Sequence, residues 1–249
     1  MSPRGGALVT GAARRIGRTL ALRAAALGYA VAIHHRRSEA EANAVKAEIE
    51  AAGGEAVVVA ADLADVGVAT PLIDTARAAI GPLTLLVNNA SLFEDDRIET
   101  LTAATWDAHM AVNLRAPVLL AQAFGRQAPE GSLIVNLLDQ RVWRPTPQFF
   151  SYAVSKAGLW QATRMLAQAL APRIRVNAIG PGPTLPSIHQ SEAAFAAEAD
   201  RVPLKRRATP EEIADALAYL IDAPSVTGQM IAVDAGQHLA WRTPDVTAP

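Results

Sequence analysis

A tyrosine and a lysine four residues apart, Tyr152 and Lys156, form the pair in this 249-residue sequence that is best suited to moving a proton. On a helix this spacing places both side chains on one face. A neighbouring ammonium favours the ionised form of a phenol, so we expect the pKa of Tyr152 to lie below its ordinary value of about 10. Such a phenol can exchange a proton with a bound substrate near neutral pH.

A glycine-containing loop near the N-terminus is the second segment with a recognisable chemistry. An apolar run leads into the loop TGAARRIG, residues 10–17, just before a helical pattern begins. Gly11 allows the tight turn after a strand, and Gly17 allows the helix to pack closely against the sheet. The helix start presents free N–H groups and a positive dipole end, which suit a pyrophosphate. We therefore expect a dinucleotide to be held by Gly11, Arg15, Ile16 and Gly17.

A basic cluster after the second apolar run indicates which dinucleotide is bound. An NAD site normally carries an acidic residue there to bind the ribose 2′-hydroxyl. This sequence has no acid at that place and instead has His34, Arg36, Arg37 and Ser38. Cations and a hydroxyl suit a 2′-phosphate, so we expect NADPH, with Arg15 as a further cation. After the third apolar run, Asp62 and Leu63 either bond the adenine amino group or cap the next helix, and both readings stay open.

The elements that must position these residues alternate along the chain. Short apolar runs predict strands at 7–10, 30–34, 56–60, 83–88, 132–137, 174–178 and 230–233, and amphipathic runs predict helices at 16–27, 39–52, 68–80, 104–124, 152–170 and 211–220. Apolar strands separated by helices predict an α/β fold, a doubly wound Rossmann-type parallel sheet of about seven strands covered on both faces. We expect one domain over residues 1–242, with a possible substrate lid at 181–203 and a tail at 243–249.

Composition excludes several other kinds of protein. The formal net charge is −1, which argues against a surface for nucleic acid. The sequence contains no cysteine, which excludes disulfides and thiolate metal sites and fits a reducing compartment. No apolar run approaches the roughly 20 residues needed to span a bilayer. We expect a cytoplasmic protein without metal, membrane or nucleic-acid partners.

Taken in order, these segments resemble the short-chain dehydrogenase/reductase family over nearly the whole chain. The matching pieces are the glycine loop, Asn88-Asn89-Ala90 after the fourth strand, Asn113, the Tyr152/Lys156 pair and Pro181-Gly182. The resemblance implies that Asn89 and Ala90 close over the adenine ribose and that Pro181 and Gly182 lie beside the nicotinamide. It implies that Lys156 holds the nicotinamide ribose and that Asn113 holds a water linking this lysine to solvent. It also implies a homotetramer built from helices 104–124 and 152–170 and from the C-terminal segment.

Two residues depart from the usual family pattern: Arg15 stands where the family usually has a glycine, and Asp139 narrows the resemblance. Asp139 stands thirteen residues before the tyrosine, where the family usually has a serine. A carboxylate would repel the alkoxide that develops when a ketone is reduced, but it can pair with an N–H-rich heterocycle. The sequence is thus similar to pteridine reductases and to dihydromonapterin or dihydrofolate reductases of short-chain type, on Arg15, His34, Arg37, Ser38, Asn89, Ala90, Ser91, Phe93, Asp139, Tyr152 and Lys156. That resemblance implies that Phe93 stacks a pterin against the nicotinamide and that Ser91 bonds the pterin.

Two other functions remain open. The first is a general carbonyl reductase acting on a 3-oxoacyl thioester or on a sugar or alcohol substrate, against which Asp139 argues. The second is a non-enzymatic NADP(H) sensor, against which the presence of Tyr152, Lys156 and Asn113 argues.

Overall fold

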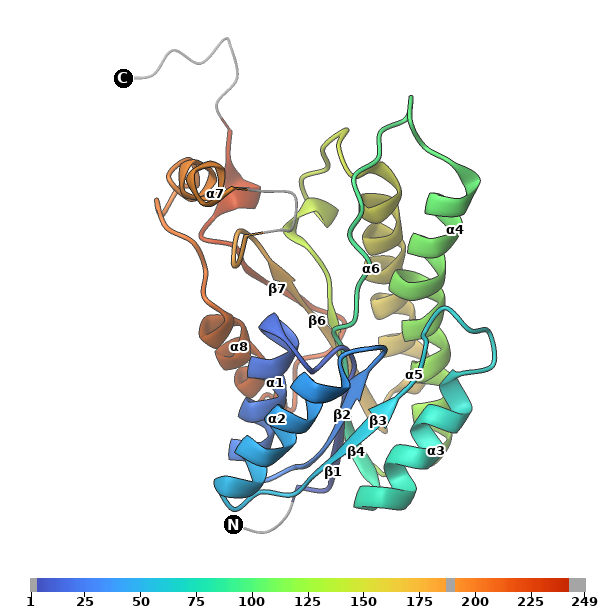
Figure 1. Ribbon diagram of the computed structural model, residues 1–249. Coiled ribbons are helices and arrows are strands. Elements are labelled where there is room, and N and C mark those ends of the chain that lie inside the picture. The colour runs from blue at the N-terminus through green and yellow to red at the C-terminus, as the bar shows by residue number, and fades with distance from the viewer. Residues whose placement is uncertain (1–3, 187–190, 242–249) are drawn as a thin grey trace.

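Seven apolar segments form one parallel sheet in the computed structural model, which describes residues 4–186 and 191–241 (Figure 1). The strands are β1 Gly6–Val9, β2 Ala30–His35, β3 Ala56–Ala60, β4 Leu83–Asn88, β5 Ser132–Leu137, β6 Ile174–Pro181 and β7 Met230–Val233. The helices are α1 Arg15–Ala26, α2 Glu39–Ala51, α3 Ala69–Ile80, α4 Ala103–Met110, α5 Ala116–Gln127, α6 Phe150–Leu170, α7 Glu192–Ala199 and α8 Pro210–Asp222. The expected doubly wound α/β fold with seven parallel strands is confirmed; the expected tail at 243–249 lies outside the described residues.

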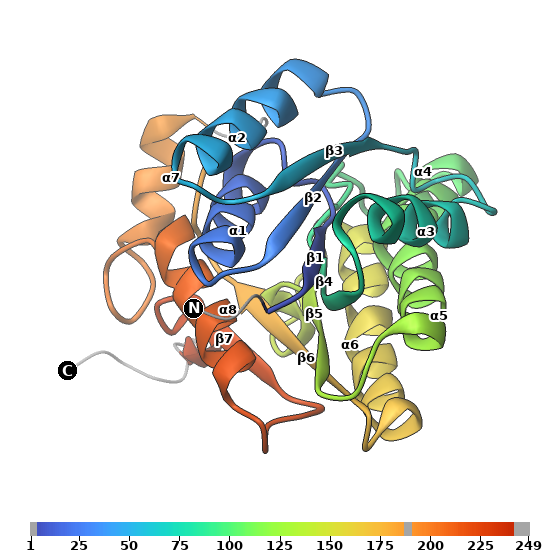
Figure 2. The same ribbon diagram turned by 90° about the horizontal axis from the view of Figure 1, so that it is seen from below.

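Helices cover both faces of the sheet because successive strand side chains point to opposite faces. In β1, Ala7 and Val9 pack against α1, α2 and α8, whereas Leu8 packs against α3, α5 and α6. Figure 2 shows these two groups of helices on either side of the sheet. All three β1 side chains are buried, as expected for a strand covered on both faces.

The strand order is β3-β2-β1-β4-β5-β6-β7. From β1 the chain first adds strands on one side, β2 and β3, and then on the other side from β4 onward, so the switch point lies between β1 and β4. Loops leave the carboxyl ends of these two neighbouring strands toward opposite faces, which opens a crevice at that edge of the sheet. The glycine loop follows β1 and the Asn89 segment follows β4, so the topology brings these two segments together. Within the described part of the chain, no helix is long and apolar enough to cross a membrane.

Three expected segments differ from the structure by more than a residue or two at their ends. The expected helix 104–124 is interrupted by a π-helical turn, Ala111–Arg115, between α4 and α5. Such turns lie frequently at functional sites, and this one contains Asn113. The strand expected at 174–178 continues to Pro181, because residues from Ala178 onward pair with β7. The expected lid also contains a helix, α7, so only part of it is loop; residues 187–190 lie outside the described residues.

Candidate active site

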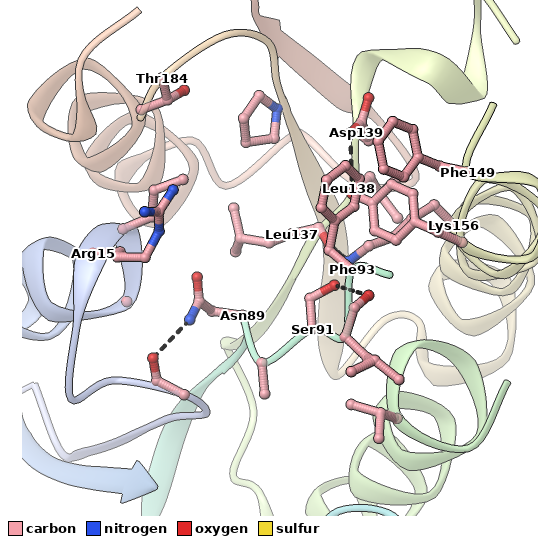
Figure 3. Close-up of a pocket in the computed structure, with 18 of the residues that line it drawn as sticks. Arg15, Asn89, Ser91, Phe93, Leu137, Leu138, Asp139, Phe149, Lys156 and Thr184 are labelled. Atoms are coloured by element: carbon pink, nitrogen blue, oxygen red, sulfur yellow. Dashed lines mark hydrogen bonds between the residues drawn. The ribbon is translucent and has the colours of Figure 1, made fainter. Parts of the chain in front are cut away.

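A pocket of about 990 Å³ opens at the carboxyl ends of the strands (Figure 3). Its size is at the upper end of the usual range for small-molecule sites, which leaves room for a cofactor and a substrate. The expected site residues that line it are Gly11, Arg15, Ile16, Gly17, His34, Arg36, Asp62, Leu63, Asn89, Ala90, Ser91, Phe93, Asp139, Tyr152, Lys156, Pro181 and Gly182. Three others, Arg37, Ser38 and Asn113, do not line it.

The glycine loop has the shape of a phosphate cradle. Gly11 has φ +63°, a left-handed conformation that favours glycine, and a Cβ on it would lie 2.9 Å from Ala90 Cα. A Cβ on Gly17 would collide with the carbonyl oxygen of Gly11 and the side-chain amide of Asn89. That amide donates hydrogen bonds to the carbonyls of Thr10, at 2.8 Å, and Gly11, at 3.1 Å. The first turn of α1 has no side-chain cap, so its N–H groups are available to a pyrophosphate.

His34 does not have the expected cationic role. The side chain is buried, and burial lowers its pKa to about 4, so the imidazole is neutral at pH 7. Its Nδ1 accepts a hydrogen bond from the Gly11 N–H at 3.0 Å, and its Nε2 donates to the Ala61 carbonyl at 3.2 Å. His34 therefore ties the glycine loop to the segment after β3 and contributes no positive charge to a 2′-phosphate.

The remaining basic residues lie at the rim of the cofactor half. Arg36 lines the pocket with its guanidinium 3.9 Å from the Asp62 carboxylate, and Arg14, which was not expected in the site, also lines it and pairs with Glu41. Ser38 is the N-cap residue of α2, but its hydroxyl makes no capping bond and is available to an anion at that helix start. These groups fit a 2′-phosphate once the positive charge is assigned to the arginines.

Asp62 forms a local turn. Its Oδ1 accepts a hydrogen bond from the Ala64 N–H at 3.0 Å. The next helix, α3, begins seven residues later at Ala69, and Val68 is its N-cap residue. Of the two open readings, the helix cap is therefore wrong, and Asp62 and Leu63 line the pocket.

The Asp139 carboxylate is the centre of the substrate half. It accepts three hydrogen bonds: from the Tyr152 hydroxyl at 3.0 Å, from the Arg141 backbone N–H at 2.8 Å and from the Arg141 guanidinium at 3.1 Å. Figure 3 shows Asp139 beside Phe149 and Phe93 on one side of the pocket. The Nε of Arg141 is buried and has no hydrogen-bond partner among the described residues. Asp139 and Arg141 both line the pocket, so it presents a carboxylate already paired with a guanidinium.

The expected fall in the pKa of Tyr152 is wrong for this structure. Burial and then the neighbouring Asp139 carboxylate raise the pKa of Tyr152 well above its ordinary value, while Arg141 opposes that rise. Lys156 lies 5.7 Å from the centre of the tyrosine ring and donates its hydrogen bond to the Leu137 carbonyl at 2.8 Å. Burial lowers the pKa of Lys156 to about 8. The helical spacing brings the pair together as expected, but burial and Asp139, not the lysine, decide the direction in which the pKa of Tyr152 shifts.

Asn113 connects the loop that follows β4 to α6. Its Nδ2 donates to the Leu92 carbonyl at 2.9 Å and to the Ser155 hydroxyl at 3.1 Å. Its Oδ1 accepts from the Leu92 N–H at 2.8 Å and the Ser91 hydroxyl at 3.2 Å. These four bonds use the whole capacity of the amide, so the side chain has no group left to hold the water that the resemblance implies.

Phe93 lies in an aromatic cluster with Tyr152, which was expected in the site, and with Phe149, which was not. Its ring stacks on Phe149 at 4.3 Å with 18° between the planes, and it meets Tyr152 edge-on at 4.7 Å. Phe149 has φ +54°, a conformation that is strained for a phenylalanine and that concentrates at functional sites. The guanidinium of Arg141 lies 5.6 Å from the Phe149 ring centre. This cluster gives the pocket a flat aromatic wall beside Asp139.

Other wall residues carried no clear signal in the sequence. The expected lid contributes Thr184, Leu185 and Phe195, and the carbonyl of Leu185 accepts a hydrogen bond from the Arg15 guanidinium at 3.3 Å. Arg141 could have been noticed from its place two residues after Asp139. Phe195 could not, because one phenylalanine in an alanine-rich helix indicates only burial. Among the described residues, no cluster of acidic and histidine side chains could hold a metal ion.

Comparisons with known proteins agree with this geometry. A family model described as enoyl-(acyl carrier protein) reductase matches residues 11–238. The crystal structure of FolM alternative dihydrofolate reductase 1 from Brucella suis in complex with NADP is 50% identical, with a TM-score of 0.95 over 99% of this chain and 100% of that chain. A putative ketoacyl reductase 2 of granaticin polyketide synthase from Streptomyces violaceoruber is 35% identical over 94% of this chain and 96% of the relative. A short-chain type dehydrogenase/reductase from Picea abies is 34% identical over 93% of this chain and 91% of the relative.

Proposed function

Because the chain belongs to the short-chain dehydrogenase/reductase family, we propose that it is an NADPH-dependent oxidoreductase that reduces a pterin-type substrate, a dihydropterin, dihydromonapterin or dihydrofolate. The similarity to a dihydrofolate reductase crystallised with NADP, at 50% identity over almost the whole chain, supports both the cofactor and the substrate class.

One observation carries the choice of substrate: the Asp139 carboxylate beside a flat aromatic wall. A pterin presents ring N–H and amino donors along one edge, which a carboxylate can accept together. Its ring carbonyl is an acceptor suited to the guanidinium of Arg141, a residue that also lines the pocket. Its face can stack on Phe93 in the offset arrangement that aromatic rings prefer. A simple ketone offers neither the donors nor the flat face.

The cofactor residues follow from the cradle. We assign the pyrophosphate to Gly11, Arg15, Ile16 and Gly17 and the 2′-phosphate to Arg36, Arg37 and Ser38. The adenosine and nicotinamide parts belong to Asp62, Leu63, Asn89, Ala90, Tyr152, Lys156, Pro181 and Gly182. His34 keeps Gly11 in place through its neutral imidazole. NADPH, when bound, supplies the hydride.

Tyr152 is the proton donor for the ring nitrogen next to the carbon that receives the hydride. Because its pKa is raised, the hydroxyl keeps its proton at neutral pH and is in the acid form that a reduction needs. In the free protein the hydroxyl donates to Asp139. When substrate N–H groups occupy the carboxylate, we expect the hydroxyl to turn to the ring nitrogen. Lys156 holds its position at the Leu137 carbonyl and supplies a nearby positive charge.

A carbonyl reductase is the second candidate, because a ketoacyl reductase is among the relatives. A substrate panel separates the two functions, with the oxidation of NADPH followed by its absorbance. We expect turnover of dihydropterin and dihydrofolate and little turnover of 3-oxoacyl thioesters or simple ketones. Good turnover of ketones with none of pterins would replace the proposal. Binding of NADPH without turnover of any substrate would favour the sensor.

We also propose that the protein acts in the cytoplasm as a homotetramer. Val154 and Met165 on α6 are exposed in the monomer, as are Leu239 and Trp241 near the C-terminal end of the described residues. Met230 on β7, in contrast, is buried in the protein's own core. Exposed large apolar side chains on a long helix suit a contact between copies.

A further inference from the structure

Three buried polar side chains lie next to the candidate active site without a role in the proposed chemistry. They are Asp96, His109 and Ser151, with exposed fractions of 3%, 0% and 0%. Buried polar groups are costly unless they are hydrogen-bonded, so a cluster of three requires a structural or functional reason. This cluster joins the loop between β4 and α4, residues 89–102, to α4 and to the start of α6.

The hydrogen bonds form a chain in which each group donates to the next, from the Glu94 N–H to the Asp96 carboxylate. The Glu94 N–H donates to Nε2 of His109 at 3.2 Å, so that nitrogen carries no proton. Nδ1 of His109 therefore holds the proton and donates it to the Ser151 hydroxyl at 2.6 Å. The Ser151 hydroxyl in turn donates to the Asp96 carboxylate. Each donor meets an acceptor only while the imidazole is neutral.

Asp96 also caps α6 from a distance. The helix's own N-cap residue, Phe149, has left-handed backbone angles and makes no side-chain capping bond. The Asp96 carboxylate instead accepts the Ser151 N–H at 3.0 Å, and its main-chain carbonyl accepts the Phe150 N–H at 3.2 Å. A carboxylate at this end of a helix is also favoured by the helix dipole.

The two ends of the cluster are adjacent to the two residues that the chemistry needs. Glu94 directly follows Phe93, and Ser151 directly precedes Tyr152. The Phe93 ring meets the Tyr152 ring edge-on at 4.7 Å. His109 lies between the two segments, with its own ring 6.2 Å from that of Tyr152. The cluster therefore ties the aromatic wall of the pocket to the helix that carries the proton donor.

We propose that Asp96, His109 and Ser151 are positioning residues that hold the Phe93 ring against Tyr152 and thereby set the width of the substrate slot. The inference rests on the proposed function in one respect, that Phe93 contacts the substrate. It adds residues that neither touch the cofactor nor line the pocket. Small displacements of a positioning group change rates because reaction requires a narrow range of geometries.

Acid should loosen this link. A second proton on His109 would sit on Nε2 and face the Glu94 N–H, so that contact would be lost. Burial lowers the pKa of His109 below 6.5; the carboxylates of Asp96 and Glu94 and the Thr105 backbone oppose that shift, and Lys156 adds to it. The neutral form therefore dominates at pH 7, and the link weakens only as the pH falls below that ordinary value.

Ser151→Ala is the direct test, because it removes the shared hydroxyl while the residue 151 N–H can still bond Asp96. We expect the KM for dihydropterin to rise about tenfold, the size of one lost buried hydrogen bond, and the Kd for NADPH to stay within about twofold. Hydrogen exchange should accelerate at the amides of residues 93–96. Thr163→Val is the matched control: Thr163 is also fully buried on α6 and hydrogen-bonded, but it lies away from the loop.

The outcomes are separable. The proposal is overturned if Ser151→Ala and Thr163→Val change the KM for dihydropterin and loop exchange alike, or if the Kd for NADPH rises as much as that KM. If the parent protein reduces no dihydropterin, the proposed function fails, and the exchange comparison alone decides the positioning role. If Ser151→Ala does not fold, His109→Gln decides, because glutamine can donate and accept but cannot gain a proton. The parent's KM should then rise as pH falls from about 7.5 to about 5.5, and that of His109→Gln should not.

Discussion

Replacing Arg141 by methionine removes a positive charge from the centre of the substrate half while keeping most of the side chain's length. In the parent, the guanidinium donates to Asp139 at 3.1 Å and lies over Phe149, and it opposes the rise in the pKa of Tyr152. Without it, the carboxylate faces Tyr152 uncompensated and strengthens the hold of the hydroxyl on its proton. The proton donor then becomes weaker, and the carboxylate loses the contact that orients it.

The size of the effect follows from the burial of the pair. A hydrogen bond to a charged group contributes about 1.5–3 kcal/mol. Because 21% of the Arg141 side chain remains exposed, solvent screens part of this, and we take the lower half of that range. A loss of about 1.5–2 kcal/mol lowers kcat/KM by about 10- to 30-fold.

The assay is initial-rate NADPH oxidation with dihydropterin at saturating cofactor. Arg144→Met is the matched control, since Arg144 is exposed, does not line the pocket and, among the described residues, makes one side-chain hydrogen bond, 3.4 Å long, to the Gln237 carbonyl. The control should keep the parent rate. The reasoning is refuted if Arg141→Met stays within about twofold of the parent, or if both variants lose activity equally.

Three further outcomes are expected. NADPH should bind more tightly than NADH, and Arg37→Ala, or Arg36→Ala at the pocket rim, should remove most of that preference, about 10- to 150-fold in the ratio of the two Kd values; equal Kd values in the parent would exclude a 2′-phosphate site. Burial lowers the pKa of Lys156 to about 8, so its positive charge is lost as the pH rises past that value. In a pH–rate profile, kcat/KM should therefore fall on the alkaline side, and a profile that stays flat to about pH 10 would contradict this. Light scattering at micromolar concentration should give four times the mass of one chain, and Met165→Glu on the exposed side of α6 should lower it; a monomeric parent would refute the assembly.

The sheet was predictable because each strand is a short apolar run between turn residues. The strands at 56–60, 83–88, 132–137 and 230–233 match to the residue. The prediction of one continuous helix over 104–124 was wrong at Asn113. The side-chain amide of Asn113 bonds the loop that follows β4, and a π-helical turn accompanies that contact. The spacing of apolar residues along a helix cannot predict a hydrogen bond to a loop that is distant in sequence.

The site was predictable where spacing along one element decides the geometry. Tyr152 and Lys156 share a helix face, and the glycine loop follows its strand directly. The charge states were not predictable in the same way: His34 is neutral and Tyr152 keeps its proton because both are buried, and burial depends on neighbours distant in sequence. For the same reason Asp96, which caps α6 from 55 residues away, gave no signal near that helix.

Asp139→Ser tests the central claim most directly, because it restores the residue that the wider family usually has at this position. The measurement is kcat/KM for dihydropterin and for a 3-oxoacyl thioester in the parent and in the variant, with Tyr152→Phe as the inactive reference. We expect the variant to lose most of its pterin turnover, since the N–H edge of the ring no longer meets a carboxylate, while its thioester turnover stays equal or rises. Full pterin turnover in Asp139→Ser would contradict the assignment.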